Sequence, residues 1–377
     1  MQLKPFRIEQ YYGKHEFTAE CMLSSSDCES RAIGELLALE PDAQERLLAQ
    51  RCGYTESPGA PSLREAISAG YSGLSPEDVV VASSAEEAIF VAYHALLRPG
   101  DHAIVETPCY ESALELARST GAEVSCWNRR FEDQWAHDLE ALEDLLRPNT
   151  KLLYINTPHN PTGTQMPRAV FDQVVELARE ANLVLFSDEV YRELEHDPSA
   201  QLPGACQVYE RGVSLGSISK SYGLPGLRIG WLTTRDRRLL QAVLELKYYT
   251  TICSSGPSEF LTALALRNRR TLLERNRGIV RRNLPLLASF IEERADLFQW
   301  VPPTASPIGF PRVPAEVDTA SFCAEVVAAT SVLLLPGTVY DEPRHIRFGF
   351  GRENMPVALE RLRAYLGGHR SAGRWSP

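Results

Sequence analysis

Short apolar runs alternate with helical segments over residues 78–232, and this alternation limits the possible folds more than any other feature of the sequence. Most of the runs are apolar nearly throughout, which is typical of strands that are covered on both faces. Segments such as EEAIFVAYHALL and RAVFDQVVELARE lie between them and have helical periodicity. The pattern predicts an α/β fold around a buried, mostly parallel seven-stranded sheet. The seven runs are DVVVA, HAIVE, AEVSCW, KLLYIN, LVLFSDE, VSLGSIS and RIGWLT.

The chain has 377 residues, of which 44% are hydrophobic. Single hydrophobic cores stop growing at roughly 250–300 residues, so this length predicts two domains. A long helical pattern begins after residue 256, and a shorter α+β region rich in proline follows it. We therefore expect a large domain at 47–262 and a smaller α+β domain formed by 1–46 and 263–377.

Charge and composition exclude several classes of partner. The net charge of −10 leaves no basic field for nucleic acid. No run of about 18 apolar residues occurs and the N-terminus lacks the apolar core of a signal peptide, so we expect no membrane partner and a cytoplasmic location. The eight cysteines are scattered singly without partners at metal-ligand spacing. They are interpreted as reduced thiols, and no metal site is expected.

The most specific motif is SISKSYGLPGLRIGW, which contains Lys220. A lysine on a loop is normally a solvated charge. Here Ser217 and Ser219 offer hydroxyls just before it, and Arg228 offers a planar fork suited to phosphate eight residues later. An amine in such a place can condense with an aldehyde, and once released it can move a proton.

Two further motifs follow predicted strands. NTPHNPTGT, with Asn160, is a loop after KLLYI, at the strand end where open α/β sheets bind ligands. LVLFSDEVYREL ends a strand on Asp188 and places Tyr191 next to it. Asp188 could cap the following helix. Alternatively, its carboxylate could hold a proton on a pyridine nitrogen and so make the ring an electron sink.

The last two signals are weaker on their own. VVVASSAEEAI runs from a strand into Ser84, Ala85 and Glu86, where small residues at a helix start let backbone N–H groups reach an anion. A plain Ser cap is equally consistent with this pattern. Arg347 in HIRFGFG could hold a carboxylate through two hydrogen bonds, or it could be a surface arginine.

Together these motifs resemble the class I/II aminotransferases of fold type I, which depend on pyridoxal 5'-phosphate (PLP), and the resemblance covers nearly the entire chain. It implies that Lys220 forms a Schiff base with PLP and later acts as acid and base. It implies contacts of Asp188 to the ring nitrogen and of Asn160 and Tyr191 to the phenolic oxygen. The remaining cofactor contacts that it implies are Tyr110 on the ring, and Ser217, Ser219, Arg228 and the backbone around Ser84, Ala85 and Glu86 at the phosphate.

The resemblance also has implications for substrate and assembly. Arg347, with Asn160, would bind the α-carboxylate of an amino acid. GYTESPGAPSLREAI resembles the segment that lends a tyrosine, here Tyr54, to the phosphate of the neighbouring subunit. Such a shared site implies a homodimer.

The chain departs from the family at two places. Ser84 stands where the phosphate turn usually has Gly, which we expect to be tolerated. The segment HEFTAECMLSSSDCES replaces a Gly-Glu-Pro-like stretch that borders the substrate. Together with the preceding PFRIEQYY, it resembles the corresponding segment of capreomycidine synthases, which eliminate a β-hydroxyl from an arginine derivative and close a ring. Glu16, Asp27 and Glu29 could then meet a guanidinium, or they could be caps and solvated charges.

We therefore expect a PLP-dependent enzyme that acts at the α-carbon of an L-amino acid, with transamination as the first hypothesis. Capreomycidine-synthase-like elimination and cyclisation, or another PLP lyase reaction, are the alternatives. A regulator that uses this fold as a ligand sensor is a further class, but no basic helix-turn-helix precedes the fold.

Overall fold

A computed structural model describes residues 3–370 of the chain, and its centre is a seven-stranded sheet with strand order β1-β7-β6-β5-β4-β2-β3. β7 runs antiparallel to β1 and β6, and all other pairs are parallel. The predicted mostly parallel α/β sheet is therefore confirmed. The strands are β1 (Val79–Ala82), β2 (His102–Thr107), β3 (Glu123–Asn128), β4 (Thr150–Asn156), β5 (Val184–Asp188), β6 (Gly212–Ser217) and β7 (Gly230–Thr234).

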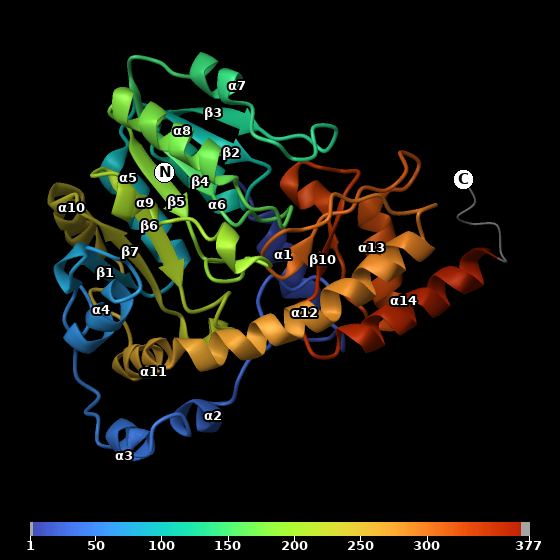
Figure 1. The fold of residues 1–377 in the computed structure, drawn as a ribbon, viewed down its shortest axis with the longest axis horizontal. Coiled ribbons are helices and arrows are strands. Elements are labelled where there is room, and N and C mark those ends of the chain that lie inside the picture. The colour runs from blue at the N-terminus through green and yellow to red at the C-terminus, as the bar shows by residue number, and fades with distance from the viewer. Residues whose placement is uncertain (1–2, 371–377) are drawn as a thin grey trace.

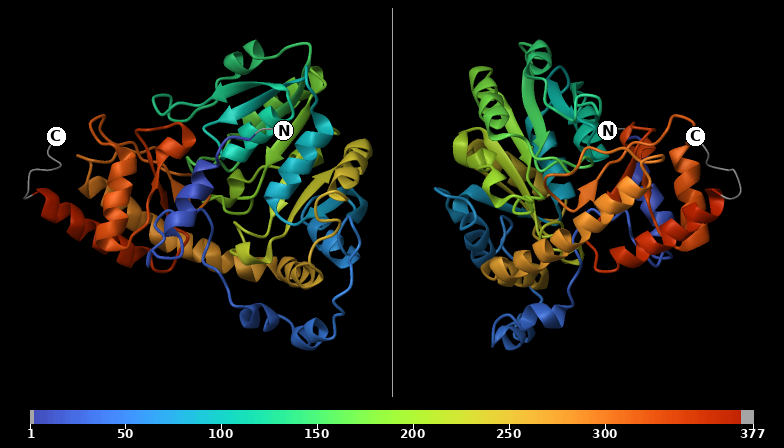
Figure 2. Two further views of the ribbon diagram at one scale, coloured as in Figure 1. Left: turned by 180° about the vertical axis from the view of Figure 1, so that it is seen from behind. Right: turned by 45° about the vertical axis from the view of Figure 1, so that its right-hand side comes forward.

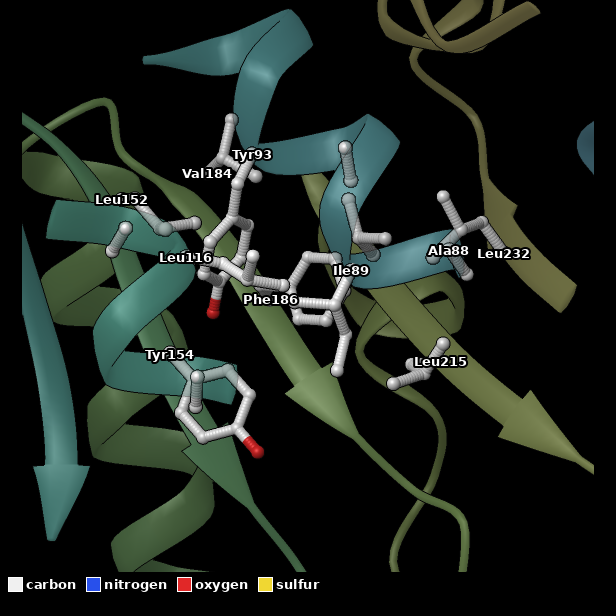
Figure 3. Close-up of a cluster of buried hydrophobic side chains, with 14 of the residues drawn as sticks. Ala88, Ile89, Tyr93, Leu116, Leu152, Tyr154, Val184, Phe186, Leu215 and Leu232 are labelled. Atoms are coloured by element: carbon white, nitrogen blue, oxygen red, sulfur yellow. The ribbon is translucent and has the colours of Figure 1, made fainter. Parts of the chain in front are cut away.

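Both faces of this sheet are buried, which explains why its strands are apolar in sequence. Alternate residues along a strand point to opposite faces. In β5, Phe186 joins a cluster under α5 and α6, while Leu185 joins a second cluster under α8. Figure 3 shows the first cluster, in which the Phe186 ring packs edge-on against Tyr93 and parallel to Tyr154.

Helices cover the sheet on both sides (Figure 1). The helices around it are α4 (Pro61–Ser68), α5 (Ala85–Leu96), α6 (Glu111–Ser119), α7 (Leu139–Asp144), α8 (Arg168–Glu180), α9 (Ala205–Val208), α10 (Arg237–Lys247) and α11 (Gly256–Arg267).

A second, smaller body packs around a three-stranded antiparallel sheet of order β8-β10-β9. The helix α12 runs along both bodies (Figure 1). The predicted boundary at residue 263 falls inside α11, and the division into 47–262 and the remainder stays a prediction. The elements of this body are α12 (Arg269–Glu293), β8 (Ile308–Gly309), α13 (Thr319–Thr330), β9 (Leu335–Pro336), β10 (Ile346–Gly349) and α14 (Met355–Arg370).

The N-terminal residues take two separate paths. Helix α1 (Arg7–His15) lies between the two bodies, whereas α2 (Ile33–Leu37) and α3 (Ala43–Leu48) lie on an arm that projects away from them (Figures 1 and 2). Across residues 3–370, no helix has the length and apolar character needed to span a membrane.

Strand register decides where polar side chains gather. Asn156 pairs with Asp188, and Asp188 pairs with Leu215, so β4, β5 and β6 end at the same edge. β7 begins at that edge, because Gly230 pairs with Ser217, and β1 ends there at Ala82. Five strand termini thus meet at one edge of the sheet, which is where sheets of this kind bind ligands.

Candidate active site

Lys220 lies at this edge, just after β6, and is half-buried. Its amine donates a hydrogen bond to Ser26 Oγ at 2.9 Å. Burial lowers the pKa of this amine, because the charged form loses its hydration. Ser217 and Ser219 lie beside it, and their hydroxyls hydrogen bond to each other at 2.9 Å. The lowered pKa shifts the balance of this amine toward its neutral, nucleophilic form.

Asp188 ends β5 inside the site. Its carboxylate accepts hydrogen bonds from Tyr154 Oη (3.0 Å) and from the Val190 N–H (3.2 Å). Despite this support, burial raises its pKa to about 6. A cation placed against this carboxylate would restore its charged form.

Asn160 and Tyr191 flank the same space. The Asn156 side chain fixes the loop by accepting a hydrogen bond from the Asn160 N–H at 2.7 Å and by donating to Asp188 O at 2.9 Å. Asn160 Oδ1 faces the small body, where it accepts from Arg347 and Tyr340, each at 3.1 Å. Tyr191 Oη is buried and lacks a hydrogen-bond partner among the described residues. A buried phenol of this kind calls for a ligand oxygen.

The start of α5, together with Arg228, borders the site on another side, which we call the anion-binding wall. Ser84 caps the helix, because its hydroxyl accepts from the Glu87 N–H at 3.1 Å, and its extended backbone explains why Gly is not needed there. Ala85 and Glu86 are the first helical residues, whose N–H groups have no carbonyl partner within a helix. Gly230 permits this arrangement, since a Cβ there would lie 2.4 Å from Ala85 N.

Arg228 completes this wall in a left-handed conformation (φ 52°), with its side chain exposed. Its guanidinium donates to Pro225 O at 3.1 Å and acts electrostatically on Glu86. Burial raises the pKa of Glu86 to about 7, and the acids Glu9 and Asp188 add to the increase. The helix start, the hydroxyls and the guanidinium have the chemistry that an anion such as a phosphate would require.

Arg347 is buried (2% exposed) on β10, and all of its partners are neutral oxygens. It donates to Ser24 O (2.9 and 3.2 Å), to Tyr12 Oη (2.7 Å) and to Tyr340 Oη, in addition to Asn160. No described acid forms an ion pair with it. A buried cation with only neutral partners would be stabilised by an anionic group bound beside it.

Helix α1 borders the site on the side of Arg347 and Tyr110. Glu9, Tyr12 and Glu16 are spaced three and four residues apart and share one face. Glu9 Oε1 accepts from Tyr110 Oη at 2.5 Å, and the Tyr110 ring packs on Phe6 with 5.0 Å between centroids. Glu16 is exposed, and its pKa is raised by partial burial and by the nearby acids Glu9 and Asp27. This face brings two carboxylates to the site that holds Lys220 and Arg347.

The other two predicted substrate acids already bind a guanidinium of the chain itself. Asp27 accepts two hydrogen bonds from Arg352 at 2.9 and 3.0 Å. Glu29 accepts from the Glu353 N–H at 2.9 Å and lies 3.7 Å from Arg352. Of the three acids, Glu16 alone has a carboxylate without a hydrogen bond among the described residues.

Tyr54 does not reach the site of its own chain. It is 90% exposed and neighbours Thr55, whose hydroxyl donates to Ser254 O at 3.2 Å. Ser254 Oγ in turn lies 3.3 Å from Ser83 Oγ, beside the start of α5. Tyr54 is therefore placed at the surface near the anion-binding wall.

Four residues of the site were missed by sequence reasoning: Glu9, Tyr12, Ser26 and Tyr340. The heptad spacing of Glu9 and Glu16 was a usable signal for one helix face. Ser26 and Tyr340 gave none, because Ser26 lies in an irregular segment and Tyr340 ends a short 3₁₀ helix, and only the fold brings them to Lys220 and Arg347.

Residues 24–362 match the family model described as aminotransferase class I and II. The chain belongs to this family. It is accordingly a PLP-dependent enzyme, and its residues fit that cofactor. The unpartnered Tyr191 phenol suits a phenolic oxygen, the buried Asp188 carboxylate suits a protonated ring nitrogen, and the start of α5 suits a phosphate.

Individual relatives include both transaminating and cyclising enzymes. The capreomycidine synthase of Streptomyces vinaceus is 29% identical over 366 residues, which cover 96% of this chain and 94% of the relative. The crystal structure of a PLP-dependent aminotransferase from Streptococcus suis superimposes with a TM-score of 0.93 at 32% identity and full coverage of both chains. The PLP-dependent cyclase OrfR superimposes with a TM-score of 0.91 at 28% identity over 98% of both chains.

Proposed function

We propose that Lys220 removes the α-proton of an L-amino acid in this site and that the outcome is transamination. The observation that carries the proposal is the buried Arg347, whose guanidinium has no anionic partner among the described residues. An α-carboxylate bound there would point the α-carbon toward the wall that holds Lys220. Membership of the aminotransferase family supports this outcome.

Each protein group has a distinct task in this proposal. PLP, when bound, supplies an electron sink for the α-carbon. Asp188 would hold a proton at the ring nitrogen, Asn160 and Tyr191 would bind the phenolic oxygen, and Lys220 Nζ would take the α-proton and return it. Asn160 also orients Arg347 through its Oδ1, so cofactor and substrate positions are coupled.

A single half-reaction tests the proposal. Purified enzyme is mixed with single amino acids, including arginine, without any keto acid. Transamination converts the bound cofactor to its amine form and releases one equivalent of keto acid, measured by absorbance and mass spectrometry. Arg347→Met should retain the cofactor spectrum but lose on the order of 10²-fold in kcat/KM, because it removes bidentate binding of the carboxylate. Release of no keto acid from any amino acid would contradict transamination.

A second outcome, elimination of a β-hydroxyl followed by ring closure, is favoured by one observation. The α1 face brings Glu9 and Glu16 to the site, and carboxylates at that place suit a cationic side chain such as a guanidinium. The likeness to a capreomycidine synthase and to the cyclase OrfR supports it further. The test is a β-hydroxylated arginine with substoichiometric enzyme: multiple turnovers without any keto acceptor would support cyclisation over transamination.

We further propose that the enzyme works as a homodimer with shared active sites. Four exposed apolar side chains, Tyr54, Tyr248, Tyr249 and Ile252, lie on two segments that Lys247 joins by donating hydrogen bonds to Ser57 O and Ile252 O. We call this set the tyrosine patch. Large exposed patches of this kind mark interaction surfaces. In a dimer that forms through this patch, Tyr54 of one copy would lie near the anion-binding wall of the other copy.

A cytoplasmic location is part of the same proposal. All eight cysteines are free thiols in the structure, as a reducing compartment favours. Cell fractionation with an antibody against the chain tests the location directly, and recovery outside the cytoplasm would contradict it.

A further inference from the structure

The N-terminal segment of residues 21–29 lies directly against the catalytic lysine. Cys28 N–H donates to Lys220 O at 3.3 Å, and Ser24 O accepts from Arg347. The segment thus touches both groups on which the proposed function depends. Within it, the one side chain that hydrogen bonds to the Lys220 amine is Ser26, at 2.9 Å.

The backbone holds Ser26 in place independently of its own side chain. Gly349 N–H donates to Leu23 O at 2.8 Å, and Glu29 N–H donates to Gly351 O at 2.9 Å. Close packing adds to this restraint, since a Cβ at Gly349 would lie 2.0 Å from Ser25 O and one at Gly351 would lie 2.5 Å from Asp27 O. Asp27, the next residue, is anchored by its two hydrogen bonds from Arg352.

The Ser26 hydroxyl therefore reaches Lys220 from a rigid support. It also lies near the Tyr191 phenol without meeting the geometry of a hydrogen bond, and its proximity opposes the increase that burial causes in the pKa of that phenol. No other described side chain accepts a hydrogen bond from Lys220 Nζ. The direction of the amine is consequently set by a single hydroxyl.

The geometry points to Ser26 as a positioning residue for Lys220: its hydroxyl accepts one hydrogen of the free amine and so turns the nitrogen lone pair toward the substrate α-carbon. This inference rests on the proposed function, because it assumes that Lys220 moves the α-proton. Ser26 neither gains nor loses a proton in the reaction. Misplacing a catalytic group by about 1 Å can cost on the order of 10²-fold in rate, so one hydroxyl can matter.

The first test measures proton transfer. Ser26→Ala is compared with Ser26→Thr, which keeps a hydroxyl, and with Ser25→Ala, a matched control in the same buried segment whose hydroxyl makes no hydrogen bond to the described residues. We expect Ser26→Ala to lower kcat and α-hydrogen exchange into D₂O by about 10- to 100-fold with KM nearly unchanged. The isotope effect on kcat with α-deuterated substrate should rise, Ser26→Thr should recover most of the rate, and Ser25→Ala should match the wild type.

The second test uses the protein without cofactor, so it does not depend on turnover. Lys220 is labelled with unphosphorylated pyridoxal and borohydride across a pH series, and the label is quantified by peptide mapping. A hydroxyl that accepts from the amine stabilises its charged form more than its neutral form. The midpoint of labelling should therefore move to lower pH in Ser26→Ala and stay unchanged in Ser25→Ala.

The two possible failures can be distinguished. Wild-type enzyme that exchanges no α-hydrogen with any amino acid contradicts the proposed function itself. Wild-type enzyme that exchanges, with Ser26→Ala unchanged in kcat, isotope effect and labelling midpoint, overturns only the role of Ser26. An equal loss in Ser25→Ala also overturns it, because the segment rather than the hydroxyl would then be responsible.

Discussion

At the scale of single residues, Asp188 combines burial with incomplete stabilisation of its charge. Tyr154 and the Val190 N–H support the carboxylate, yet burial raises its pKa to about 6. In the role that we propose for Asp188, a cationic ring nitrogen would supply the partner that the carboxylate lacks. Without a cation beside it, the charged form of this carboxylate is less stable than it would be in water.

Replacing Asp188 by Asn should preserve shape but remove the charge that keeps the ring nitrogen protonated. We expect kcat to fall by on the order of 10²–10³-fold, as when a preorganised electrostatic group is removed. Absorbance spectra will verify that PLP is still bound. Unchanged kcat with full occupancy would contradict the assignment of Asp188 to the ring nitrogen.

The pKa of Glu86 leads to a prediction of how the affinity for PLP depends on pH. Its pKa of about 7 is the result of burial, reinforced by Glu9 and Asp188. Below pH 7 the side chain is mostly neutral, and above pH 7 it is mostly negative, in the first turn of α5 and within electrostatic reach of Arg228. Affinity for PLP, measured by fluorescence titration, should therefore decrease as the pH rises through 7.

Glu86→Gln is the control for that measurement, since it keeps the shape and removes the charge. Its PLP affinity should no longer fall between pH 6 and pH 8. A pH profile that is the same in both proteins would assign the dependence to another group.

At the scale of secondary-structure elements, a buried network joins the ends of β2, β3 and β4. Glu106 accepts from Arg129 at 3.1 Å, from His137 at 3.0 Å and from the Asn156 N–H at 2.8 Å. Asn156 then holds Asn160 through its side chain. The ion pair therefore supports the loop that carries Asn160 into the site.

Arg129→Met tests this network, because it leaves Glu106 buried without its main cation. Breaking a buried pair typically costs about 3–5 kcal/mol. The adjacent Arg130, whose side chain is 71% exposed, is the matched control, and Arg130→Met should change the free energy of unfolding by less than about 1 kcal/mol. Urea unfolding of both variants gives the comparison, and equal stability would contradict the role of the network.

At the scale of the whole molecule, the active site lies between two bodies and an N-terminal helix. Lys220 and Asp188 come from the large sheet, Arg347 from the small one, and Glu9 from α1. The arm that carries α3 projects away from this unit (Figures 1 and 2). The side chains of the tyrosine patch are exposed to solvent. The arm and the patch are the surfaces from which a second copy could complete the site.

Tyr249→Arg tests the proposed dimer, since Tyr249 is 90% exposed in the tyrosine patch. A charge at the centre of an apolar interface should weaken association by about 2 kcal/mol or more. Analytical ultracentrifugation should show a dimer for the wild type and for Val357→Arg, an exposed apolar residue on α14, but a shift to monomer for Tyr249→Arg. A monomeric wild type would exclude the shared site.

The sequence by itself determined the sheet and the local motifs at its edge. Continuous apolar runs such as LVLFSDE require a sheet covered on both faces, and a strand that stops at Asp188 puts that acid at the ligand-binding edge whatever surrounds it. These features depend on periodicity and on neighbours in the chain, which a sequence displays directly.

Only the tertiary structure decided how distant segments meet. It paired Asp27 with Arg352, placed Ser26 against Lys220 and set Arg347 among neutral oxygens. The residues in each of these contacts are far apart in the chain. No local pattern in the sequence therefore shows that Asp27, rather than Glu16, pairs with an arginine. That choice depends on how the two bodies and the N-terminal segment pack, because packing sets both the distances and the burial that control each charge.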